Sequence, residues 1–291
     1  MAGTGGVVLV NPESGPHPEP AAEVREHFGD HDVVECHGDD LEEIATAAIG
    51  RAPEFVAMAG GDGSIRCLAS LLAGTGIPLV PVPTGTRNHF ALELGIQTVA
   101  DAAAAPGGVR RRVDLAEVNG ERFVNNASVG FYAALVRERD AHERHLPKAL
   151  ANVTAAWAQA RRGHRFRATV DGRAYRAWLV FVGNGCYGEG LSDLMSRQAL
   201  DGAVLDVRVL RADAALARTR TVLALLLGRL GASPLLASSR ECEVEIGLAV
   251  RAVSMALDGE VVDLTPPLRF RSLPGALTVL VPAGADAKVT P

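Results

Sequence analysis

The feature that most constrains the fold is an alternation of short apolar runs with segments of helical spacing in the first hundred residues. The apolar runs are Val7–Val10, Val33–Cys36, Phe55–Ala59 and Leu79–Val82. The segments with helical spacing are Leu41–Ile49, Ile65–Leu72 and Phe90–Leu94. Strands that alternate with helices indicate βαβ units, so the sequence predicts an α/β domain built around a parallel sheet.

Turn-forming residues follow three of these predicted strands, at Asn11, Gly60 and Pro83. Parallel strands bring their carboxyl ends to one edge of a sheet, and ligands in such folds bind beyond that edge. We therefore expect a ligand site where the three turns converge.

The second half of the chain is predicted to be rich in strands. The strand-like runs are Val113–Val118, Phe123–Ser128, Phe166–Val170, Tyr175–Val182, Val204–Leu210, Val244–Ile246, Val253–Leu257 and Leu277–Val281. Asp171-Gly172, between two of them, is a signal for a hairpin turn. Two helical stretches, Pro147–Arg161 and Ala214–Leu230, interrupt the pattern. We expect a second, β-rich domain with helical insertions, beginning near residues 110–126.

The charge of the chain bears on its partners. The formal net charge is −5, which disfavours a general nucleic-acid binder. Residues 1–63 hold 13 acidic against 2 basic side chains, whereas residues 137–176 hold 10 basic against 4 acidic ones. A cationic surface on an acidic protein suggests an anionic partner such as a phosphate or a lipid headgroup. A solvated face with no partner is the alternative explanation of the same charges.

The four cysteines are scattered, with neither a CxxC pair nor a histidine at zinc spacing. Disulfide frameworks and structural zinc are therefore disfavoured, and a cytoplasmic location is predicted. The first ten residues lack the charged start of a signal peptide. The most apolar stretch, Thr221–Leu236, contains Arg229 and Pro234 and is too short to span a bilayer. Its basic and apolar sides suit either peripheral contact with a membrane or packing on the β-rich domain.

The three turns after the predicted strands share glycines and hydroxyl groups. They are Asn11-Pro12-Glu13-Ser14-Gly15, Gly60-Gly61-Asp62-Gly63-Ser64 and Pro83-Thr84-Gly85-Thr86-Arg87-Asn88. Glycines let backbone N–H groups approach an anion, and the N-terminus of a following helix carries partial positive charge. Ser14, Ser64 and Thr86 add hydroxyls that can bond phosphate oxygens. The turns therefore predict a phosphate-binding site.

Asp62 stands in the middle of the second turn, where a carboxylate would repel a phosphate. Its position predicts either a bridging Mg²⁺ or a role as the N-cap of the following helix. None of the turns matches GxxxxGK[ST] or GxGxxG, which disfavours Walker-type and Rossmann cofactor sites.

These turns also belong to longer motifs. NPESG at 11–15 is similar to an NPxSG element, GGDGS at 60–64 to GGDGT, and PTGTRNHFALELG at 83–95 to PxGTxNxFAxxLG. VDLAEVNGERFVNNASVG at 113–130 and Leu257-Asp258-Gly259-Glu260 continue the series in order. On these motifs the chain resembles the diacylglycerol kinase catalytic-domain family, which includes bacterial lipid kinases and sphingosine and ceramide kinases.

The resemblance implies a fold and an activity. It implies an ATP-binding α/β domain over residues 1–120 and a β-sandwich-like, lipid-binding domain with helical insertions over residues 121–291. It also implies transfer of the γ-phosphoryl group of ATP to a lipid hydroxyl with Mg²⁺.

The resemblance further implies roles for individual residues. The implied nucleotide site consists of Asn11, Ser14, Gly60, Gly61, Asp62, Gly63, Ser64, Thr86 and Asn88. The implied metal ligands are Asp62, Asp114 and Asp201. Glu260 or Asp258 is implied as the base that takes the hydroxyl proton, with Glu260 preferred because a hairpin turn already accounts for Asp258. Strand alternation predicts that these two side chains point to the same face.

The chain departs from the family pattern at two places, and simpler roles remain open for several residues. His89 stands where family members commonly have Asp, and Gly202 where an acid is common, which puts a metal at Asp201 in doubt. Asp114 is alternatively an acid beside a loop. Asn125 and Asn126 are alternatively polar ends of a strand.

Three functions are consistent with the sequence. The first is an ATP-dependent lipid kinase that acts on a diacylglycerol-like lipid. The second is a kinase of a soluble substrate, of the NAD kinase or phosphofructokinase type, which shares the GGDG turn. The third, suggested by His89 and the loop at 201–205, is a nucleotide- or lipid-binding protein that has lost turnover.

Overall fold

The computed structural model describes residues 5–15, 19–130, 165–188, 197–213 and 233–289. The chain forms two compact units. Unit 1 consists of residues 1–115, 199–203 and 273–291, and unit 2 of residues 116–198 and 204–272. The predicted second domain, 121–291, thus contains two segments that belong to unit 1.

Unit 1 contains a parallel sheet, as the sequence predicts. Its strands are β1 (Val7–Val10), β2 (Asp32–Glu35), β3 (Val56–Gly60), β4 (Leu79–Pro83) and the end of β15 (Leu268–Val281). The order is β15-β4-β3-β1-β2, and every neighbouring pair is parallel. All of β1 is buried, which fits a continuous apolar run inside a sheet covered on both faces.

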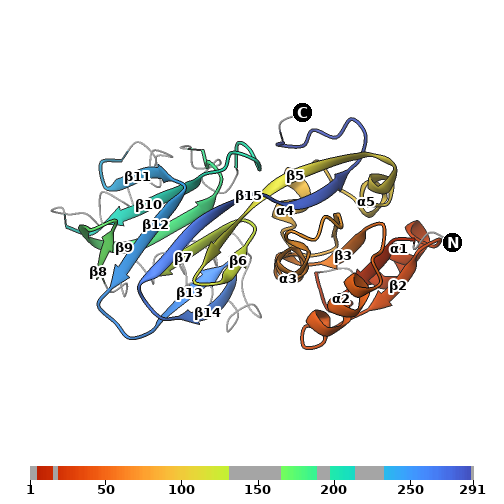
Figure 1. The fold of residues 1–291 in the computed structure, drawn as a ribbon, viewed down its shortest axis with the longest axis horizontal. Helices are drawn as coiled ribbons and strands as arrows, with labels where there is room; N and C mark the ends of the chain where they lie inside the picture. Colours follow the sequence, from red (N-terminus) through yellow and green to blue (C-terminus); the bar gives the residue numbers. More distant parts are fainter. Residues whose placement is uncertain (1–4, 16–18, 131–164, 189–196, 214–232, 290–291) are drawn as a thin grey trace, which may run out of the picture. The chain divides into compact units, whose positions relative to one another are not determined.

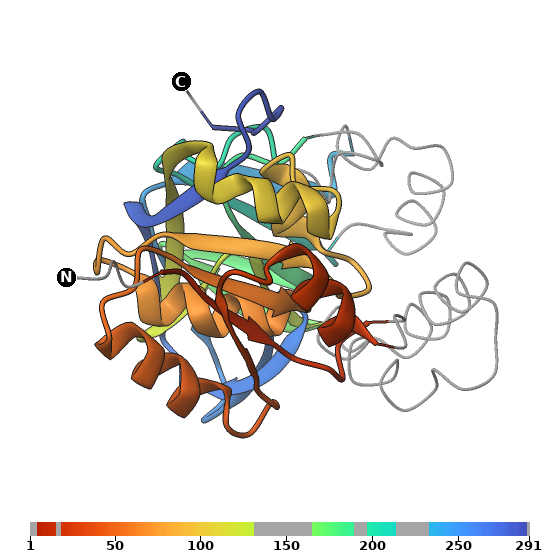
Figure 2. The ribbon, with the colours of Figure 1, turned by 90° about the vertical axis from the view of Figure 1, so that its right-hand side faces the viewer.

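Helices cover both faces of this sheet. They are α1 (Pro20–His27), α2 (Leu41–Gly50), α3 (Asp62–Leu72), α4 (His89–Glu93) and α5 (Val99–Ala104), followed by the 3₁₀ turn η1 (Ala105–Gly107). Helices α2 and α3 pack together on one face and α1 and α5 on the other (Figure 2). Ile65, Leu68 and Leu72 form the buried stripe of α3, at the spacing of an amphipathic helix. Two helices are additions to the predicted elements: α1, which begins with a proline, and α5.

Unit 2 is built of antiparallel strands (Figure 1). They are β6 (Glu121–Phe123), β7 (Asn126–Gly130), β8 (Phe166–Val170), β9 (Arg173–Asn184), β10 (Leu205–Arg211), β11 (Leu236–Glu241), β12 (Glu243–Leu248), β13 (Val253–Leu257) and β14 (Glu260–Leu264). The main order is β14-β13-β7-β9-β8-β12-β15, while β10 pairs with β9 and β11, and β5 (Val109–Val118) pairs with β15 and β6. A buried apolar cluster that includes Phe123 and Phe270 forms the core.

The predicted strands of the second half are largely confirmed, with four differences. Strand β15 begins at Leu268, well before the predicted run Leu277–Val281. The predicted run Phe123–Ser128 is split, because Val124 and Asn125 lie between β6 and β7. Strands β11 and β14 were not predicted. Strand β11 has the sequence LASSRE and no fully buried residue, so it lacks the apolar alternation of a half-buried strand.

Several other expectations can be compared with the structure. Asp171 and Gly172 have φ values of 47° and 77° and join β8 to β9, which confirms the predicted hairpin. All four cysteines are free. The predicted helices at 147–161 and 214–230 lie outside the described residues, as does most of the apolar stretch at 221–236. Among the described helices, none is long and apolar enough to cross a membrane.

Candidate functional site

The three predicted turns meet at one edge of the sheet in unit 1. Strands β4, β3 and β1 are neighbours and run parallel, so their carboxyl ends lie side by side. Asn11 donates its side-chain amide to the Ser64 hydroxyl at 3.4 Å. The Ser14 hydroxyl lies 3.4 Å from that of Thr84. The structure therefore brings together the turns that the sequence singled out.

Glycines make this close packing of turns possible. Gly15 has φ +82°, and a Cβ there would lie 2.0 Å from the Thr84 carbonyl oxygen. A Cβ on Gly85 would lie 2.6 Å from the Gly61 Cα. Such distances are far below van der Waals contact, so both positions require glycine. Gly61 differs, because its Cβ would meet no atom within 4 Å. Open space therefore borders the backbone at the start of α3.

Asp62 occupies the first turn of α3, directly after Gly61. Gly61 is the N-cap and no side chain caps the helix, so the alternative that Asp62 is the N-cap is wrong. Its Oδ1 atom is buried and has no hydrogen-bond partner. Burial raises the pKa of this carboxyl, and the charge of His89, the backbone N–H groups of Phe90 and His89, and the charge of Arg87 partly oppose that rise. A buried carboxylate oxygen without a partner is suited to a cation.

Asn88 is the last residue of the third turn and the N-cap of α4. It has φ 53° and donates its side-chain amide to the Gly85 carbonyl at 2.8 Å. Its Oδ1 atom is also buried without a hydrogen-bond partner. Two oxygen acceptors, on Asp62 and Asn88, are thus unpartnered within the same group of turns. Because buried polar groups are nearly always hydrogen-bonded, this pair marks a place for a polar ligand. Thr86, beside them, is exposed.

Asp114, a predicted metal ligand, has other contacts. It is 3% exposed, and its carboxylate accepts the backbone N–H of Ala203 at 2.6 Å and that of Gly275 at 2.7 Å. These bonds join β5, β15 and the segment 199–203, so Asp114 holds three distant parts of unit 1 together. Asp201 is half-buried in that segment. Within the described ranges, no group of three acidic, histidine or cysteine side chains could hold a metal ion. Metal binding by Asp114 and Asp201 stays a prediction.

Asp258 and Glu260 belong to unit 2, at the turn between β13 and β14. Asp258 and Gly259 have φ values of 49° and 92°. Asp258 and Gly259 are the two residues of the turn, so strand alternation, which was expected to place Asp258 and Glu260 on one face, does not apply to Asp258. Glu260 begins β14 opposite Leu257 and is exposed.

The Asp258 carboxylate is engaged by the backbone of another segment. Its Oδ2 atom accepts the N–H of Val124 at 2.7 Å. Its Oδ1 atom accepts those of Asn125 and Asn126 at 2.7 and 2.9 Å. These bonds tie the β13–β14 turn to the stretch between β6 and β7. A role of Asp258 or Glu260 as the base stays a prediction, and the contacts give Asp258 a structural task.

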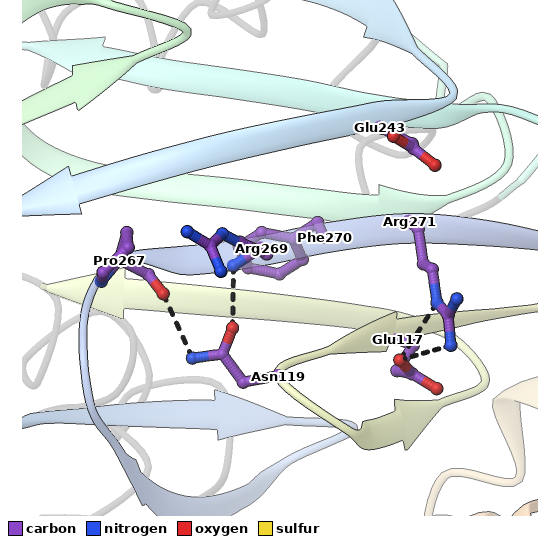
Figure 3. A pocket seen from close by; sticks show the side chains of 7 residues that line it. All are labelled: Glu117, Asn119, Glu243, Pro267, Arg269, Phe270 and Arg271. Atoms are coloured by element: carbon purple, nitrogen blue, oxygen red, sulfur yellow. Dashed lines mark hydrogen bonds and ion pairs between the residues drawn. The ribbon is translucent and has the colours of Figure 1, made fainter.

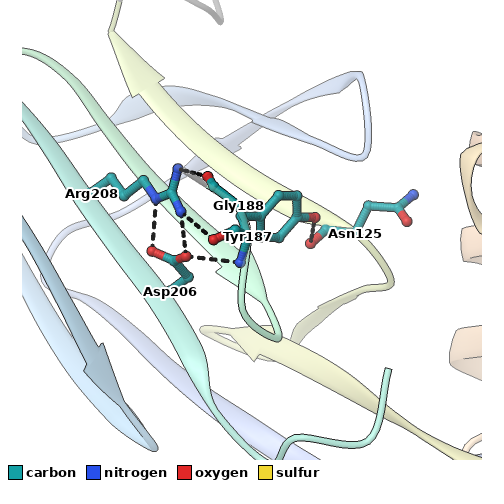
Figure 4. A network of polar contacts seen from close by, with 5 residues as sticks. All are labelled: Asn125, Tyr187, Gly188, Asp206 and Arg208. Atoms are coloured by element: carbon teal, nitrogen blue, oxygen red, sulfur yellow. Dashed lines mark hydrogen bonds and ion pairs between the residues drawn. The ribbon is translucent and has the colours of Figure 1, made fainter. Parts of the chain in front are cut away.

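A buried polar network in unit 2 escaped the sequence analysis (Figure 4). Arg208 binds both carboxylate oxygens of Asp206, at 2.9 and 2.7 Å, and donates to the carbonyls of Tyr187 and Gly188. The Tyr187 hydroxyl donates to the Asn125 carbonyl at 2.8 Å. An acid and an arginine two positions apart in a buried strand were the signal that could have revealed this network.

A groove of about 470 Å³ also lies in unit 2, beside β15 (Figure 3). Several of its polar side chains have partners in the protein. Arg271 binds Glu117 at 2.9 Å, and Asn119 bridges the Pro267 carbonyl and the Arg269 N–H. The groove therefore presents few unsatisfied groups to a ligand.

The chain resembles known proteins over most of its length. Residues 6–118 match the family described as diacylglycerol kinase catalytic domain. Residues 125–281 match the YegS C-terminal NAD kinase beta sandwich-like domain. A protein named "Probable lipid kinase YegS-like" from Pseudomonas fluorescens is 31% identical, over 84% of this chain and 82% of its own length. A "Diacylglycerol kinase" from Mycobacterium tuberculosis is 29% identical, over 58% of this chain and 63% of its own.

The fold has a solved counterpart as well. The crystal structure of a diacylglycerol kinase from Bacillus anthracis has a TM-score of 0.65 and 17% identity, and the match covers 98% of this chain and 99% of that one. An uncharacterized protein of Synechocystis is 27% identical, but the alignment spans only 56% of its length. The α/β unit followed by a β-sandwich-like unit is thereby confirmed. The chain belongs to the lipid kinase family that combines a diacylglycerol kinase catalytic domain with a YegS-type C-terminal domain, and it is a kinase.

Proposed function

We propose that this protein is an ATP-dependent kinase that transfers the γ-phosphoryl group of ATP to the hydroxyl of a diacylglycerol-like lipid. The observation that carries the proposal is the group of turns at the ends of β1, β3 and β4. Open space at Gly61 lies there beside the buried, unpartnered oxygen of Asp62. The names of the relatives support a lipid as the acceptor.

The residues of these turns fit the phosphates of a nucleotide. The backbone at Gly60 and Gly61 leads into α3, an 11-residue helix that has Gly63 in its first turn. The first N–H groups and the dipole of a helix favour an anion. Around it stand polar side chains that can donate to phosphate oxygens or orient the loops. They are Asn11, Ser14, Ser64, Thr86 and Asn88.

Asp62 fits the metal ion that accompanies ATP. Bound Mg²⁺ would supply positive charge to the phosphate oxygens during transfer. A carboxylate that burial makes costly to ionise gains most from a cation beside it, and the oxygen for that contact is unpartnered. His89 and Arg87 add positive charge around Asp62, so part of its charge is already offset.

Glu260 is proposed as the base that serves the lipid. A hydroxyl is a weak nucleophile at neutral pH, and a carboxylate can accept its proton as attack proceeds. The hydroxyl oxygen forms a bond to the γ-phosphorus while the bond from that phosphorus to ADP breaks, and the proton passes to Glu260. Glu260 is exposed at the start of β14, whereas Asp258 is bound to three backbone N–H groups. This difference favours Glu260.

We also propose that the protein acts in the cytoplasm, where it meets its lipid at an anionic membrane surface. Arg165 and Arg167, at the start of β8, are exposed and belong to the basic region of the sequence. Cations near a surface gain free energy from anionic lipids. Binding to anionic but not to zwitterionic vesicles tests this partner.

The activity is tested with labelled ATP, Mg²⁺ and mixed micelles of diacylglycerol, with NAD offered in parallel. We expect label in the lipid and none in NAD. Label in NAD alone would favour the soluble-substrate kinase. Tight ATP binding with no labelled product from any lipid extract would favour a binding protein without turnover.

The site itself is tested with Gly61→Val. The new side chain enters open space, so the fold should persist while nucleotide binding is lost. Gly107→Val is the matched control, because a Cβ there also meets no atom within 4 Å and Gly107 lies in η1. Equal ATP affinity of folded Gly61→Val and wild-type protein, measured by calorimetry, would contradict the proposed site.

A further inference from the structure

The hairpin formed by β8 and β9 in unit 2 has two different faces (Figure 1). Ala168, Val170 and Ala177 point to one face and are buried in the core of the unit. Successive side chains of a strand point to opposite faces, so Arg167 and Arg176 lie on the other face, and both are exposed. The face of the hairpin that meets solvent therefore carries positive charge.

Arg167 and Arg176 stand directly opposite each other in the register of β8 and β9. The Cβ atoms of such a pair lie about 5 Å apart on one face, where like charges are destabilising. Nearby in the same sheet, β12 places Glu245 opposite Arg269 of β15, and these two form an ion pair at 3.0 Å. The protein thus pairs opposite charges across β12 and β15 but like charges across β8 and β9.

Two more arginines extend the positive charge of the hairpin. Arg165 is exposed just before β8, and Arg173 is exposed at the start of β9. We call Arg165, Arg167, Arg173 and Arg176 the arginine patch. Within the ranges that the structure describes, none of their four guanidinium groups forms an ion pair or a hydrogen bond. Across residues 165–184, these four arginines stand against a single acidic residue, Asp171.

The acidic side chains around the patch have other partners. Asp171, in the turn of the hairpin, accepts the backbone N–H of Glu245 at 3.0 Å. Arg211 binds both carboxylate oxygens of Asp213, at 3.2 and 2.7 Å. The hydrogen bond from Arg211 is the main reason why the pKa of Asp213 is low, and the charge of Arg176 contributes a smaller part. The arginine patch therefore keeps a net positive charge.

We propose that the arginine patch docks on a membrane of anionic phospholipids, with Arg167 and Arg176 binding the phosphate of one headgroup between them. A guanidinium group matches the oxygens of a phosphate with two parallel hydrogen bonds. An anion placed between the two arginines replaces their repulsion with two attractions. The proposal deepens the proposed function and rests on it, because a kinase whose acceptor is a lipid must meet that lipid at a membrane.

The test measures sedimentation of the protein with vesicles, which requires neither ATP nor turnover. One set of vesicles is pure phosphatidylcholine, and the other is phosphatidylcholine mixed with phosphatidylglycerol. The double variant Arg167→Gln/Arg176→Gln removes two charges of the patch, and Arg167→Lys/Arg176→Lys keeps them. The matched control is Arg240→Gln/Arg251→Gln, which removes two exposed arginines of unit 2, one in β11 and one after β12.

We expect wild-type protein to bind the vesicles that contain phosphatidylglycerol and not the pure phosphatidylcholine vesicles, and to be released by added salt. A cation near an anionic surface is worth roughly fivefold in binding, so Arg167→Gln/Arg176→Gln should bind roughly 25-fold more weakly. The control should bind like wild type, and the lysine variant should recover most of the binding. The unfolding temperature of the glutamine variant should not fall, because the substitution removes a repulsion.

Three results would overturn the docking surface. The first is an equal loss of vesicle binding in Arg167→Gln/Arg176→Gln and in the control, because net charge alone would then explain it. The second is a lysine variant that binds as weakly as the glutamine variant. The third is displacement from the vesicles by soluble glycerol phosphate at constant ionic strength, which would assign the arginines to a free phosphate compound.

Failure of the proposed function is a separate result. If wild-type protein transfers no phosphate from ATP to any lipid, the proposed function is wrong, and vesicle binding is still read without turnover. If it does phosphorylate diacylglycerol but binds both kinds of vesicle equally, only the docking surface is overturned.

Discussion

Asp258 accepts the backbone N–H of Asn125 at 2.7 Å, across 133 positions of the sequence. The same carboxylate accepts the N–H groups of Val124 and Asn126. Three consecutive backbone donors therefore depend on one side chain from a turn. This contact gives Asp258 a second structural task beside the turn for which the sequence already accounted.

Replacement of Asp258 should mainly lower stability. In Asp258→Asn, the amide group turns a donor toward at least one of the backbone donors, and an unsatisfied buried donor costs about 1–3 kcal/mol. Denaturant unfolding should show a loss of that size. If Asp258 were the catalytic base, Asp258→Asn would lose turnover without losing stability. An inactive and fully stable Asp258→Asn variant would therefore assign the role of base to Asp258.

Replacement of Glu260 should lower turnover and leave stability unchanged. Glu260→Gln keeps the size of an exposed side chain but removes the proton acceptor. We expect turnover to fall roughly 10²–10⁴-fold, the scale of a general base. Stability and ATP affinity should stay at wild-type levels. Normal turnover in this variant would rule out the assignment.

Asp62→Asn should stabilise the protein while it weakens the binding of Mg²⁺-ATP. Burial raises the pKa of Asp62 above its ordinary value of 3.8, so the folded state holds the proton more tightly than the unfolded state does. The ionised carboxylate therefore lowers stability as pH rises from 3.8 through the raised pKa. The stability advantage of the variant should be absent in acid and should grow as the pH rises through the raised pKa of Asp62.

Unfolding curves of Asp62→Asn and wild-type protein over a range of pH check this prediction. A stability advantage of Asp62→Asn that does not change with pH would show that the ionisation of Asp62 is not its cause. A variant with wild-type Mg²⁺-ATP affinity would contradict the metal role of Asp62.

Gly15 and Gly61 should respond differently to alanine. Gly15→Ala places a Cβ 2.0 Å from the Thr84 carbonyl oxygen and forces a φ of +82° on an L-residue. The left-handed conformation alone costs about 1–2 kcal/mol. Gly61→Ala places its Cβ in open space and should leave the unfolding temperature almost unchanged. Equal unfolding temperatures of the two variants would contradict the described packing of the turns.

Asp114→Asn should lower stability equally with and without EDTA. Its carboxylate is satisfied by the N–H groups of Ala203 and Gly275, and an amide can serve only one of those donors with its oxygen. The expected loss is about 1–3 kcal/mol. Wild-type protein should unfold at the same temperature when EDTA is added. If EDTA markedly lowered the unfolding temperature of wild-type protein but not that of Asp114→Asn, a metal at Asp114 and Asp201 would be supported.

Local patterns were sufficient to predict much of the molecule. Alternating periodicity identified β1 to β4 and the helices α2, α3 and α4. Turn glycines identified Asp171-Gly172 and the three turns of unit 1. These features are encoded in neighbouring residues, because side-chain spacing and backbone freedom are local properties. The adjacency of the turns followed from one further rule, that parallel strands end at the same edge of a sheet.

Other features were decided by the tertiary structure alone. Nothing near Asp258 in the sequence indicates that its carboxylate accepts the N–H groups of Val124, Asn125 and Asn126. Nothing near Asp114 indicates that its carboxylate accepts those of Ala203 and Gly275. Buried polar groups must find partners, but any distant segment that folding brings within hydrogen-bond reach can supply them. The sequence by itself thus determined which turns meet at one edge of the sheet. Contacts between segments far apart in the chain decided which carboxylates accept hydrogen bonds from the backbone. Such contacts also decided which oxygen of Asp62 remains without a hydrogen-bond partner.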